Sequence, residues 1–204
     1  RIEREDIMGE YIENFVDALP DPKRVKEIKK DLESKGIKYI YSHWIDFLGS
    51  PKTKPMPISD FEDLCAGKGP QFAVHSVSFV PELGPADNDQ IPVPDLDSLL
   101  ICPWDKTCAW VFSDLWWNGK PYDVCPRQTL KKQIKKNAEA DLKFYVGMEP
   151  EFFVMKWEDG KPVKAIDRDP IPLRRQAFGY DSEYSIEGMN FLKDIIDILK
   201  IKNC

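Results

Sequence analysis

Apolar residues recur at alternate positions between Lys143 and Trp157, KFYVGMEPEFFVMKW. The alternation predicts one long strand, because neighbouring side chains of a strand point to opposite faces. One predicted face is apolar and includes Phe152, whereas the other carries Glu149 and Glu151. Two carboxylates on a buried strand need a compensating charge, and a divalent cation held by their oxygens would supply it. The alternative is an edge strand with a solvated acidic face.

Helical spacing of apolar residues predicts one short and four longer helices. Asp21 is placed to cap the second of them, and Ser59 with Glu62 has the spacing of a capping box for the short helix. The predicted helices are Arg1–Leu19, Pro22–Lys35, Ser59–Ala66, Pro126–Leu142 and Ile186–Ile201.

Runs of β-branched and aromatic residues predict strands over Ile37–Leu48, Leu99–Trp104 and Cys108–Trp117. Asn118-Gly119 predicts a primed hairpin turn after the last of these strands, and Asp159-Gly160 predicts a later turn. Between Gly69 and Pro94, five prolines predict a loop-rich segment around a short apolar stretch, and loops this long are usually functional. These strands with one short helix favour a small α+β domain.

The composition is that of a globular protein, with 204 residues, 42% of them hydrophobic and 31% charged. A net charge of −6 and the lack of a basic stripe argue against a nucleic-acid partner. There is neither a signal peptide nor an apolar run that could span a membrane, so no membrane partner is expected. Five widely spaced cysteines indicate free thiols and a cytoplasmic location. Both ends look cut, because the chain starts at Arg1 and stops within a helical pattern at Cys204.

Four ordered motifs resemble those of the glutamine synthetase family, over about Ile37 to Phe191. The resemblance extends to the branch that contains γ-glutamylmethylamide synthetase and the type III-like glutamine synthetases. The motifs are WIDFLGSPKTKPMP (Trp44–Pro57), PDLDSLLICPW (Pro94–Trp104), NGKPYDVCPRQTLKK (Asn118–Lys132) and GMEPEFF (Gly147–Phe153).

The resemblance implies an α+β fold whose β-grasp-like N-terminal domain precedes the truncated start of an antiparallel-sheet catalytic domain. The expected division is residues 1–36 as N-terminal helices, 37–122 as the β-grasp-like domain and 123–204 as the first part of the catalytic domain. The family also implies ring-shaped homo-oligomers whose active sites are shared between neighbouring subunits.

The implied activity is ATP-dependent ligation of glutamate to ammonia or a small amine through a γ-glutamyl phosphate, as in glutamine biosynthesis and nitrogen metabolism. The implied cofactors are ATP and Mg²⁺ or Mn²⁺, and Glu149 and Glu151 match the family's metal-binding glutamates. No catalytic residue is assigned within the chain, because the family's remaining site residues would lie beyond Cys204. The chain alone is therefore expected to be inactive.

One segment departs from the family pattern. Glutamine synthetases that use ammonia have Asp-Gly-Ser-Ser where this chain has Ala73, Val74, His75 and Ser76. The family's aspartate helps to form the ammonium pocket of the adjacent subunit, and Ala73 stands in its place. Loss of an anion from a cation pocket favours an organic amine such as methylamine over ammonium. Ala73, His75 and Ser76 are therefore candidate residues of an amine pocket.

Two other function classes remain open. Glycosidases also use paired carboxylates, as acid and nucleophile, and a non-catalytic member of the family would keep the fold without the reaction. Several further residues have simple structural interpretations. They are His43 as a core histidine, Lys52 and Lys54 as a solvated pair, and Trp104, Trp110, Trp116 and Trp117 as core or interface residues.

Overall fold

The computed structural model describes residues 12–78, 83–165 and 182–200. The chain divides into two compact units, Arg1–Phe144 and Tyr145–Cys204. Within the described ranges, no helix combines the length and apolar character needed to cross a membrane. The presence of both helices and strands agrees with the predicted α+β class.

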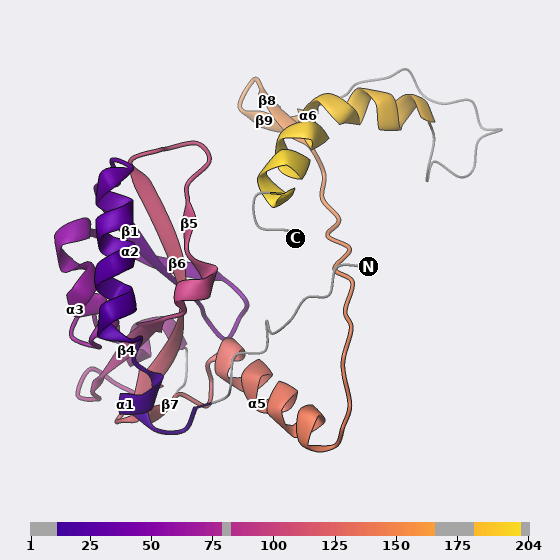
Figure 1. Ribbon diagram of the computed structural model, residues 1–204. Helices are drawn as coiled ribbons and strands as arrows, with labels where there is room; N and C mark the ends of the chain where they lie inside the picture. The colour runs from indigo at the N-terminus through magenta and orange to yellow at the C-terminus, as the bar shows by residue number, and fades with distance from the viewer. Residues whose placement is uncertain (1–11, 79–82, 166–181, 201–204) are drawn as a thin grey trace. The chain divides into compact units, whose positions relative to one another are not determined.

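A seven-stranded mixed sheet forms the centre of the first unit (Figure 1). The strand order is β2-β1-β6-β4-β3, and β5 and β7 also pair with β6. β1 runs parallel to β6, whereas the other neighbouring strands are antiparallel. The strands are β1 (Tyr39–Ile45), β2 (Pro51–Pro57), β3 (Phe72–Ala73), β4 (Asp89–Pro94), β5 (Leu100–Ile101), β6 (Cys108–Trp117) and β7 (Lys120–Pro121).

The longest strand, β6, confirms the prediction for Cys108–Trp117. It ends in a turn in which Asn118 has φ 51° and Gly119 has φ 75°. Positive φ at both central residues is the signature of a type I′ turn, whose twist suits a hairpin. The turn returns the chain as β7, so the predicted primed turn is also confirmed.

Most helices of the first unit are short, and α2 and α5 are the long ones. The predicted helix at Pro22–Lys35 is confirmed as α2. Its predicted cap is also confirmed, because the Asp21 carboxylate accepts from the Arg24 N–H over 3.1 Å. The helical elements are α1 (Phe15–Ala18), α2 (Pro22–Ser34), η1 (Ile58–Asp60), α3 (Phe61–Cys65), α4 (Val74–Ser78), η2 (Leu96–Ser98) and α5 (Pro126–Glu139).

The predicted capping box at Ser59 and Glu62 is wrong. Ser59 Oγ lies 2.6 Å from Asp60 Oδ1, and α3 has no side-chain cap. Glu62 instead forms an ion pair with Lys29 of α2 over 3.0 Å. A short 3₁₀ turn precedes the helix, so Ser59 does not occupy the N-cap position that the spacing requires.

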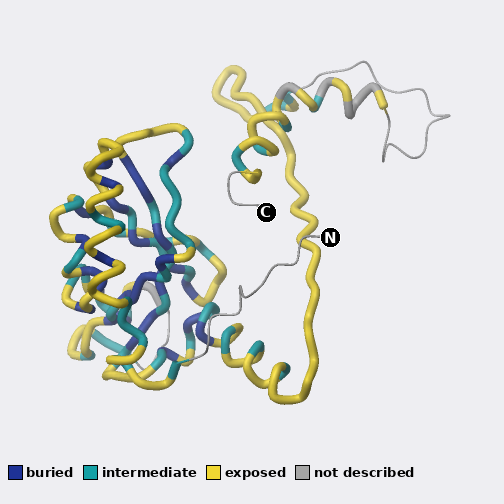
Figure 2. Tube along the Cα trace, in the orientation of Figure 1, coloured by how far each residue is buried: buried dark blue, intermediate teal, exposed yellow. Residues whose placement is uncertain are grey.

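The main core lies between the sheet and the two helices α2 and α3, which lie on the same side of it (Figure 1). Buried residues concentrate there and along the central strands (Figure 2). A second cluster surrounds Trp44, whose ring stacks on Phe72 with 4.0 Å between centroids. The fully buried members of the main core include Ile40, Phe61, Leu64 and Val111.

The region Gly69–Pro94 contains more regular structure than predicted, namely β3, α4 and β4. Proline is disfavoured inside sheets because it has no N–H to donate. Pro92 and Pro94 nevertheless lie in β4, paired with Leu115 and Ser113 of β6. β3 pairs only with Gln90 and Asp89, so among the described residues the two prolines lie where β4 has a single neighbour.

One other structural interpretation needs correction. The predicted solvated pair is wrong, because Lys52 Nζ lies 3.4 Å from the buried carboxylate of Asp46 and Lys54 Nζ donates to the Gln71 carbonyl. Among the tryptophans, Trp116 is buried in the core at 2% exposure, whereas Trp104 is 67% exposed. The four cysteines at 65, 102, 108 and 125 are free thiols, as predicted, and Cys204 lies outside the described residues.

His43 occupies a largely aromatic environment, in keeping with its interpretation as a structural histidine. Its ring lies 5.4 Å from that of Trp110 and 5.8 Å from that of Phe112. Removal of the ring from water lowers its pKa, against a hydrogen bond with the Lys52 backbone that raises it.

The second unit contains a hairpin and a helix. The predicted turn at Asp159-Gly160 is confirmed, with φ 51° and 75°, and it joins β8 (Met155–Glu158) to β9 (Lys161–Lys164). The helix α6 (Ser182–Lys200) begins earlier than the predicted Ile186. Phe152 lies 5.8 Å from Phe191 of this helix, measured between ring centroids.

Candidate functional site

Glu149 and Glu151 lie in an extended segment that precedes β8 and has no strand assignment. Both side chains are exposed. The prediction of one strand over Lys143–Trp157 is therefore wrong except for its last three residues, which begin β8 (Met155–Glu158). Phe152, expected on a core face, is 54% exposed.

The physical reason is the lack of a ladder for this segment. A strand is held by hydrogen bonds to its neighbours, and the described residues place no strand beside 143–154. Pro150 also removes one backbone donor between the two glutamates, which restricts that position to an edge or a bulge. The sequence pattern therefore predicts the buried and exposed faces of a strand correctly only where a neighbouring strand is present.

The two carboxylates suit a hard dication. Mg²⁺ is commonly held by one or two carboxylates together with phosphate oxygens and water, rather than by a complete protein cage. Among the residues that the structure describes, no group of three His, Cys, Asp or Glu side chains could hold a metal ion. Glu149 and Glu151 therefore fit an open metal site that depends on further ligands.

The candidate amine segment forms β3 and the start of α4 rather than the predicted loop. Ala73 pairs across the sheet with Asp89 of β4. Val74 is fully buried in the second core cluster, His75 is half-buried and Ser76 is exposed. The buried Nδ1 of His75 has no hydrogen-bond partner among the described residues. The stack of Phe72 on Trp44 fixes this segment against the sheet.

The two predicted groups of site residues belong to different units, since Ala73, His75 and Ser76 lie in the first and the glutamates in the second. Each group is consecutive or nearly so in sequence.

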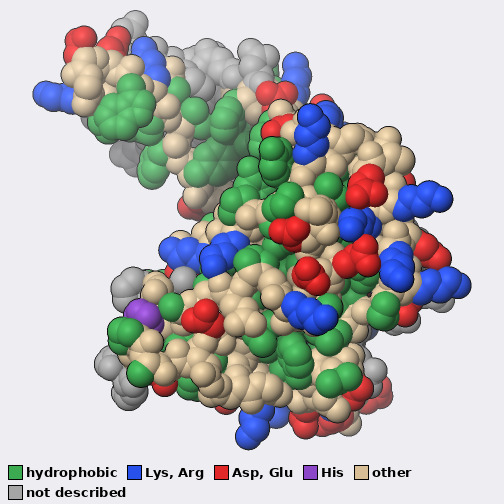
Figure 3. Space-filling view, turned by 90° about the vertical axis from the view of Figure 1, so that its left-hand side faces the viewer, with side chains coloured by type: hydrophobic (Ala, Val, Ile, Leu, Met, Phe, Trp, Pro, Cys, Tyr) green, Lys and Arg blue, Asp and Glu red, His purple; other side chains and the backbone are tan. Residues whose placement is uncertain are grey.

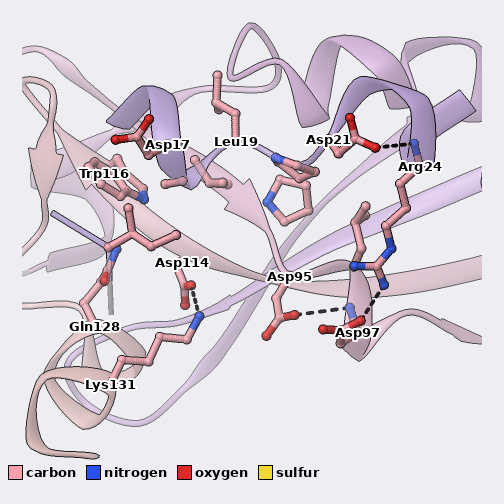
Figure 4. Close-up of a pocket in the computed structure, with 16 residues that line it drawn as sticks. Asp17, Leu19, Asp21, Arg24, Asp95, Asp97, Asp114, Trp116, Gln128 and Lys131 are labelled. Carbon is pink, nitrogen blue, oxygen red and sulfur yellow. Dashed lines mark hydrogen bonds and ion pairs between the residues drawn. The ribbon is translucent and has the colours of Figure 1, made fainter. Parts of the chain in front are cut away.

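A cleft of about 300 Å³ lies elsewhere in the first unit, where α1, α2, the end of β4, η2, β6 and α5 meet (Figure 4). Its lining is rich in charge, and five of its charged side chains form ion pairs: Arg24, Asp95, Asp97, Asp114 and Lys131. Arg127 Nη2 lies 2.7 Å from Asp95 Oδ2, and its Nε lies 2.9 Å from Asp114 Oδ1. Lys131 also binds Asp114, and Arg24 binds Asp97.

This network attaches α5 to β6, so its evident role is structural. Its residues were not singled out from the sequence, because Asp95 and Arg127 are far apart in the chain and no local spacing joins them. Asp95 and Arg127 do fall within the motifs Pro94–Trp104 and Asn118–Lys132. On the face drawn in Figure 3, basic and acidic side chains are interspersed rather than gathered into one patch.

Comparison with known proteins finds a family match for the region that contains the glutamates. Residues 123–203 match the family model of the glutamine synthetase catalytic domain. A glutamine synthetase of Rhizobium leguminosarum bv. phaseoli is 33% identical over 165 residues, which are 81% of this chain and 36% of that protein. The glutamate–methylamine ligase of Methyloversatilis universalis is 31% identical over 147 residues, 71% of this chain and 33% of that protein.

The fold is shared with solved structures. A GmaS/ADP complex superposes with a TM-score of 0.65 and 22% identity, over 86% of this chain and 39% of that chain. GmaS without ligand gives a TM-score of 0.64. This chain thus spans only about a third of the length of the relatives named above. The family predicted from the four motifs is confirmed: the chain belongs to the glutamine synthetase family, and a glutamate–methylamine ligase is among its relatives.

Proposed function

We propose that this protein is an ATP-dependent ligase that joins glutamate to ammonia or a small amine through a γ-glutamyl phosphate. The observation that carries the proposal is the pair Glu149 and Glu151, two residues apart inside the region that matches the glutamine synthetase catalytic domain. Phosphoryl transfer depends on positioning and charge neutralisation, so such carboxylates have a defined task in this reaction.

Glu149 and Glu151 would hold Mg²⁺ or Mn²⁺ through their carboxylate oxygens. When bound, the metal ion would neutralise the negative charge of the ATP phosphates and of the transferred phosphoryl group. Both glutamates are exposed, so binding requires no burial of uncompensated charge before the ligand arrives. Both glutamates belong to the 204-residue chain. Substitution of each one therefore tests the contribution of this chain to metal binding separately from that of other residues.

The test compares Glu149→Gln and Glu151→Gln in the full-length protein. Each change keeps the shape of the side chain and removes one charge, so Mn²⁺ affinity and glutamate-dependent ADP release should both fall by roughly ten-fold or more. Glu158→Gln is the matched control, because Glu158 is an exposed glutamate of β8 outside the motif. Wild-type metal affinity and activity in both variants would contradict the proposal.

The nitrogen donor that the segment after Gln71 favours is a small alkylamine. Ala73 places no charge where ammonia-using enzymes have an aspartate, and one relative is described as a glutamate–methylamine ligase. An alkylammonium has an apolar part that an alanine can contact, and one buried methyl group contributes about 0.8 kcal/mol. His75 and Ser76 would complete the polar part of the pocket.

The second test measures kcat/KM for methylamine and for ammonia in wild type and in Ala73→Asp. The wild type should prefer methylamine, and the new carboxylate should shift the preference toward ammonia. Gln71→Ala is the control, because Gln71 is exposed beside this segment, lies outside the proposed pocket and carries no charge. A wild-type preference for ammonia would contradict the amine assignment while leaving the ligase proposal intact.

The arrangement that we propose for the complete protein follows the family. Residues 1–36 are N-terminal helices, 37–122 form a β-grasp-like domain and 123–204 begin the catalytic domain, in a cytoplasmic ring whose subunits share active sites. The 204-residue chain by itself is then inactive as a ligase. Detectable γ-glutamyl transfer by this chain alone would contradict that statement, and light scattering of the full-length protein tests the ring.

A further inference from the structure

Cys102 and Cys108 lie opposite each other at the end of the β5–β6 ladder. The strands pair through Leu100 with Trp110 and Ile101 with Ala109. The next rung is formed by the Cys102 N–H, which donates to the Cys108 carbonyl over 2.9 Å. The Cys108 N–H donates instead to the Asp105 carbonyl over 3.1 Å, so the two cysteines share a single backbone hydrogen bond. Directly opposed residues of an antiparallel ladder have Cα atoms about 4.5–5.5 Å apart. Disulfides span about 4.4–6.8 Å between Cα atoms, so this backbone spacing fits a disulfide.

The two thiols share one small environment. Both residues are free and buried, at 3% and 4% exposure. The Cys108 thiol donates to Asp105 Oδ2 over 3.2 Å. Burial and then the charge of Cys108 raise the pKa of Cys102, and the charge of Cys108 is also the first cause of the raised pKa of Tyr41. An effect of Cys108 on Cys102 is expected when two sulfur atoms lie close together.

We propose that Cys102 and Cys108 form a redox-sensitive pair that closes to a disulfide when a low-molecular-weight disulfide is the oxidant. One thiolate attacks the oxidant, forms a mixed disulfide and releases one small thiol. The second thiolate attacks the protein sulfur of that mixed disulfide and releases the second small thiol. The protein loses two hydrogens and two electrons, and the small disulfide is reduced to two thiols.

The bond would close a loop of five residues, Pro103–Thr107, between the two strands. This loop carries Trp104, which packs edge-on against Trp110 with 5.2 Å between ring centroids. Oxidation also removes the S–H donor from Asp105, which keeps its hydrogen bonds from Thr107. The reaction therefore changes the end of the β5–β6 hairpin and leaves the main core in place.

The other buried cysteines provide the contrast. Cys65 lies in the main core cluster on α3, and Cys125 lies in the second cluster before α5. Neither is opposite another cysteine in the described strand registers. Both should therefore remain thiols under conditions that oxidise the proposed pair.

The experiment equilibrates the full-length protein in mixtures of reduced and oxidised glutathione, then blocks the remaining thiols under denaturing conditions. Trypsin cleaves after Lys106, which lies between the two cysteines. Oxidised protein should therefore yield two peptides joined through Cys102 and Cys108, and they should separate on reduction. The pair should form roughly ten-fold more readily in the native protein than in urea, because the ladder holds the cysteines together.

Controls separate the proposed bond from general thiol oxidation. Cys102→Ser and Cys108→Ser should each abolish the joined peptides, whereas Cys65→Ser should leave them unchanged. Since burial slows attack on a thiol, a second arm oxidises during refolding from urea. A pair that stays reduced in both arms, or that forms no more readily in the native state than in urea, overturns the proposal. Ligase activity is not a readout here, so the result is independent of the proposed function.

Discussion

The strand β6 and the segment 143–154 are both rich in apolar and aromatic residues that predict a strand, but their surroundings differ. β6 pairs with β1, β4, β5 and β7, and most of its residues are buried. In the other segment, Phe144 is 75% exposed, Met148 is 85% exposed and Phe153 is 93% exposed. Comparable patterns therefore give a core strand in one unit and an exposed extended chain in the other.

The comparison teaches that a local pattern of apolar residues predicts a strand but not its burial. Burial comes from neighbours that accept the backbone hydrogen bonds and cover the apolar side chains. The first unit provides both within its described residues. The segment 143–154 pairs with no strand among the described residues, and its aromatic side chains are largely exposed, although Phe152 contacts Phe191. These side chains should therefore contribute little to the stability of this chain.

The largest expected effect contrasts two phenylalanines. Phe61 is 0% exposed in the main core, and Phe61→Ala should lower the free energy of unfolding of the first unit by about 3–5 kcal/mol. Phe153→Ala should change it by less than about 0.5 kcal/mol, because the ring is exposed. Urea unfolding of both variants measures the difference. A comparable loss in both would mean that the segment 143–154 is packed.

The same core can be examined through Cys65. Burial, and then the nearby Glu62 charge, raises its pKa from 9.0 to about 12. At pH 8 the thiolate population should be roughly a thousand-fold lower than in the unfolded chain, so alkylation by iodoacetamide should be slower by a similar factor. Mass spectrometry of the native and urea-unfolded chain measures the ratio. Equal rates at Cys65 in the two states would refute the burial.

This raised pKa also has a consequence for stability. The folded state holds the Cys65 proton more tightly, so the contribution is fully present below pH 9.0 and is lost as the pH rises toward about 12. Cys65→Ala should therefore flatten the decline of stability over this alkaline range. If the stability of Cys65→Ala declines as steeply with pH as that of the wild type, the decline comes from other titrating groups.

A smaller effect is expected from the charges that attach α5 to β6. Asp114 is 13% exposed and binds both Arg127 and Lys131. Asp114→Asn should lower the free energy of unfolding by about 2 kcal/mol, because two cations lose their shared carboxylate. Asp123→Asn is the control, since its pair with Lys132 has side chains 82% and 46% exposed and should contribute below about 1 kcal/mol. Equal losses of unfolding free energy in the two variants would mean that the ion pairs of Asp114 contribute no more than an exposed surface pair.

Local signals predicted much of the first unit. Asp21 and Pro22 mark the start of α2, Asn118-Gly119 marks the β6–β7 turn, and each depends on residues adjacent in sequence. β4 was missed because Pro92 and Pro94 argue against a strand, and only its position beside β6 makes them acceptable. The prediction of the capping box was wrong for a similar reason, because Glu62 forms an ion pair with Lys29 of another helix, α2.

The candidate site was predicted at the level of residue type. Glu149 and Glu151 were singled out as a candidate pair because they are close in sequence, and their spacing requires no tertiary contact. The pairing of Ala73 with Asp89 was not predicted, because it depends on the register between β3 and β4. The network of Asp95, Asp114 and Arg127 joins residues from three elements, and no periodicity along the chain indicates it.

The smallest effect concerns two aspartates in the left-handed region. Asp141 has φ 55° at the end of α5, where the Leu142 N–H donates to the Asn137 carbonyl over 2.8 Å, and Asp159 has φ 51° in the β8–β9 turn. Glycine adopts this conformation without the strain that a side chain brings. Asp141→Gly should therefore stabilise the first unit by about 0.5–1 kcal/mol, measured by native-state hydrogen exchange of β6 amides. Asp159→Gly relieves the same strain in the other unit, so it should leave the exchange of those β6 amides unchanged. Stabilisation of β6 by both variants to the same extent would show that the two units unfold together.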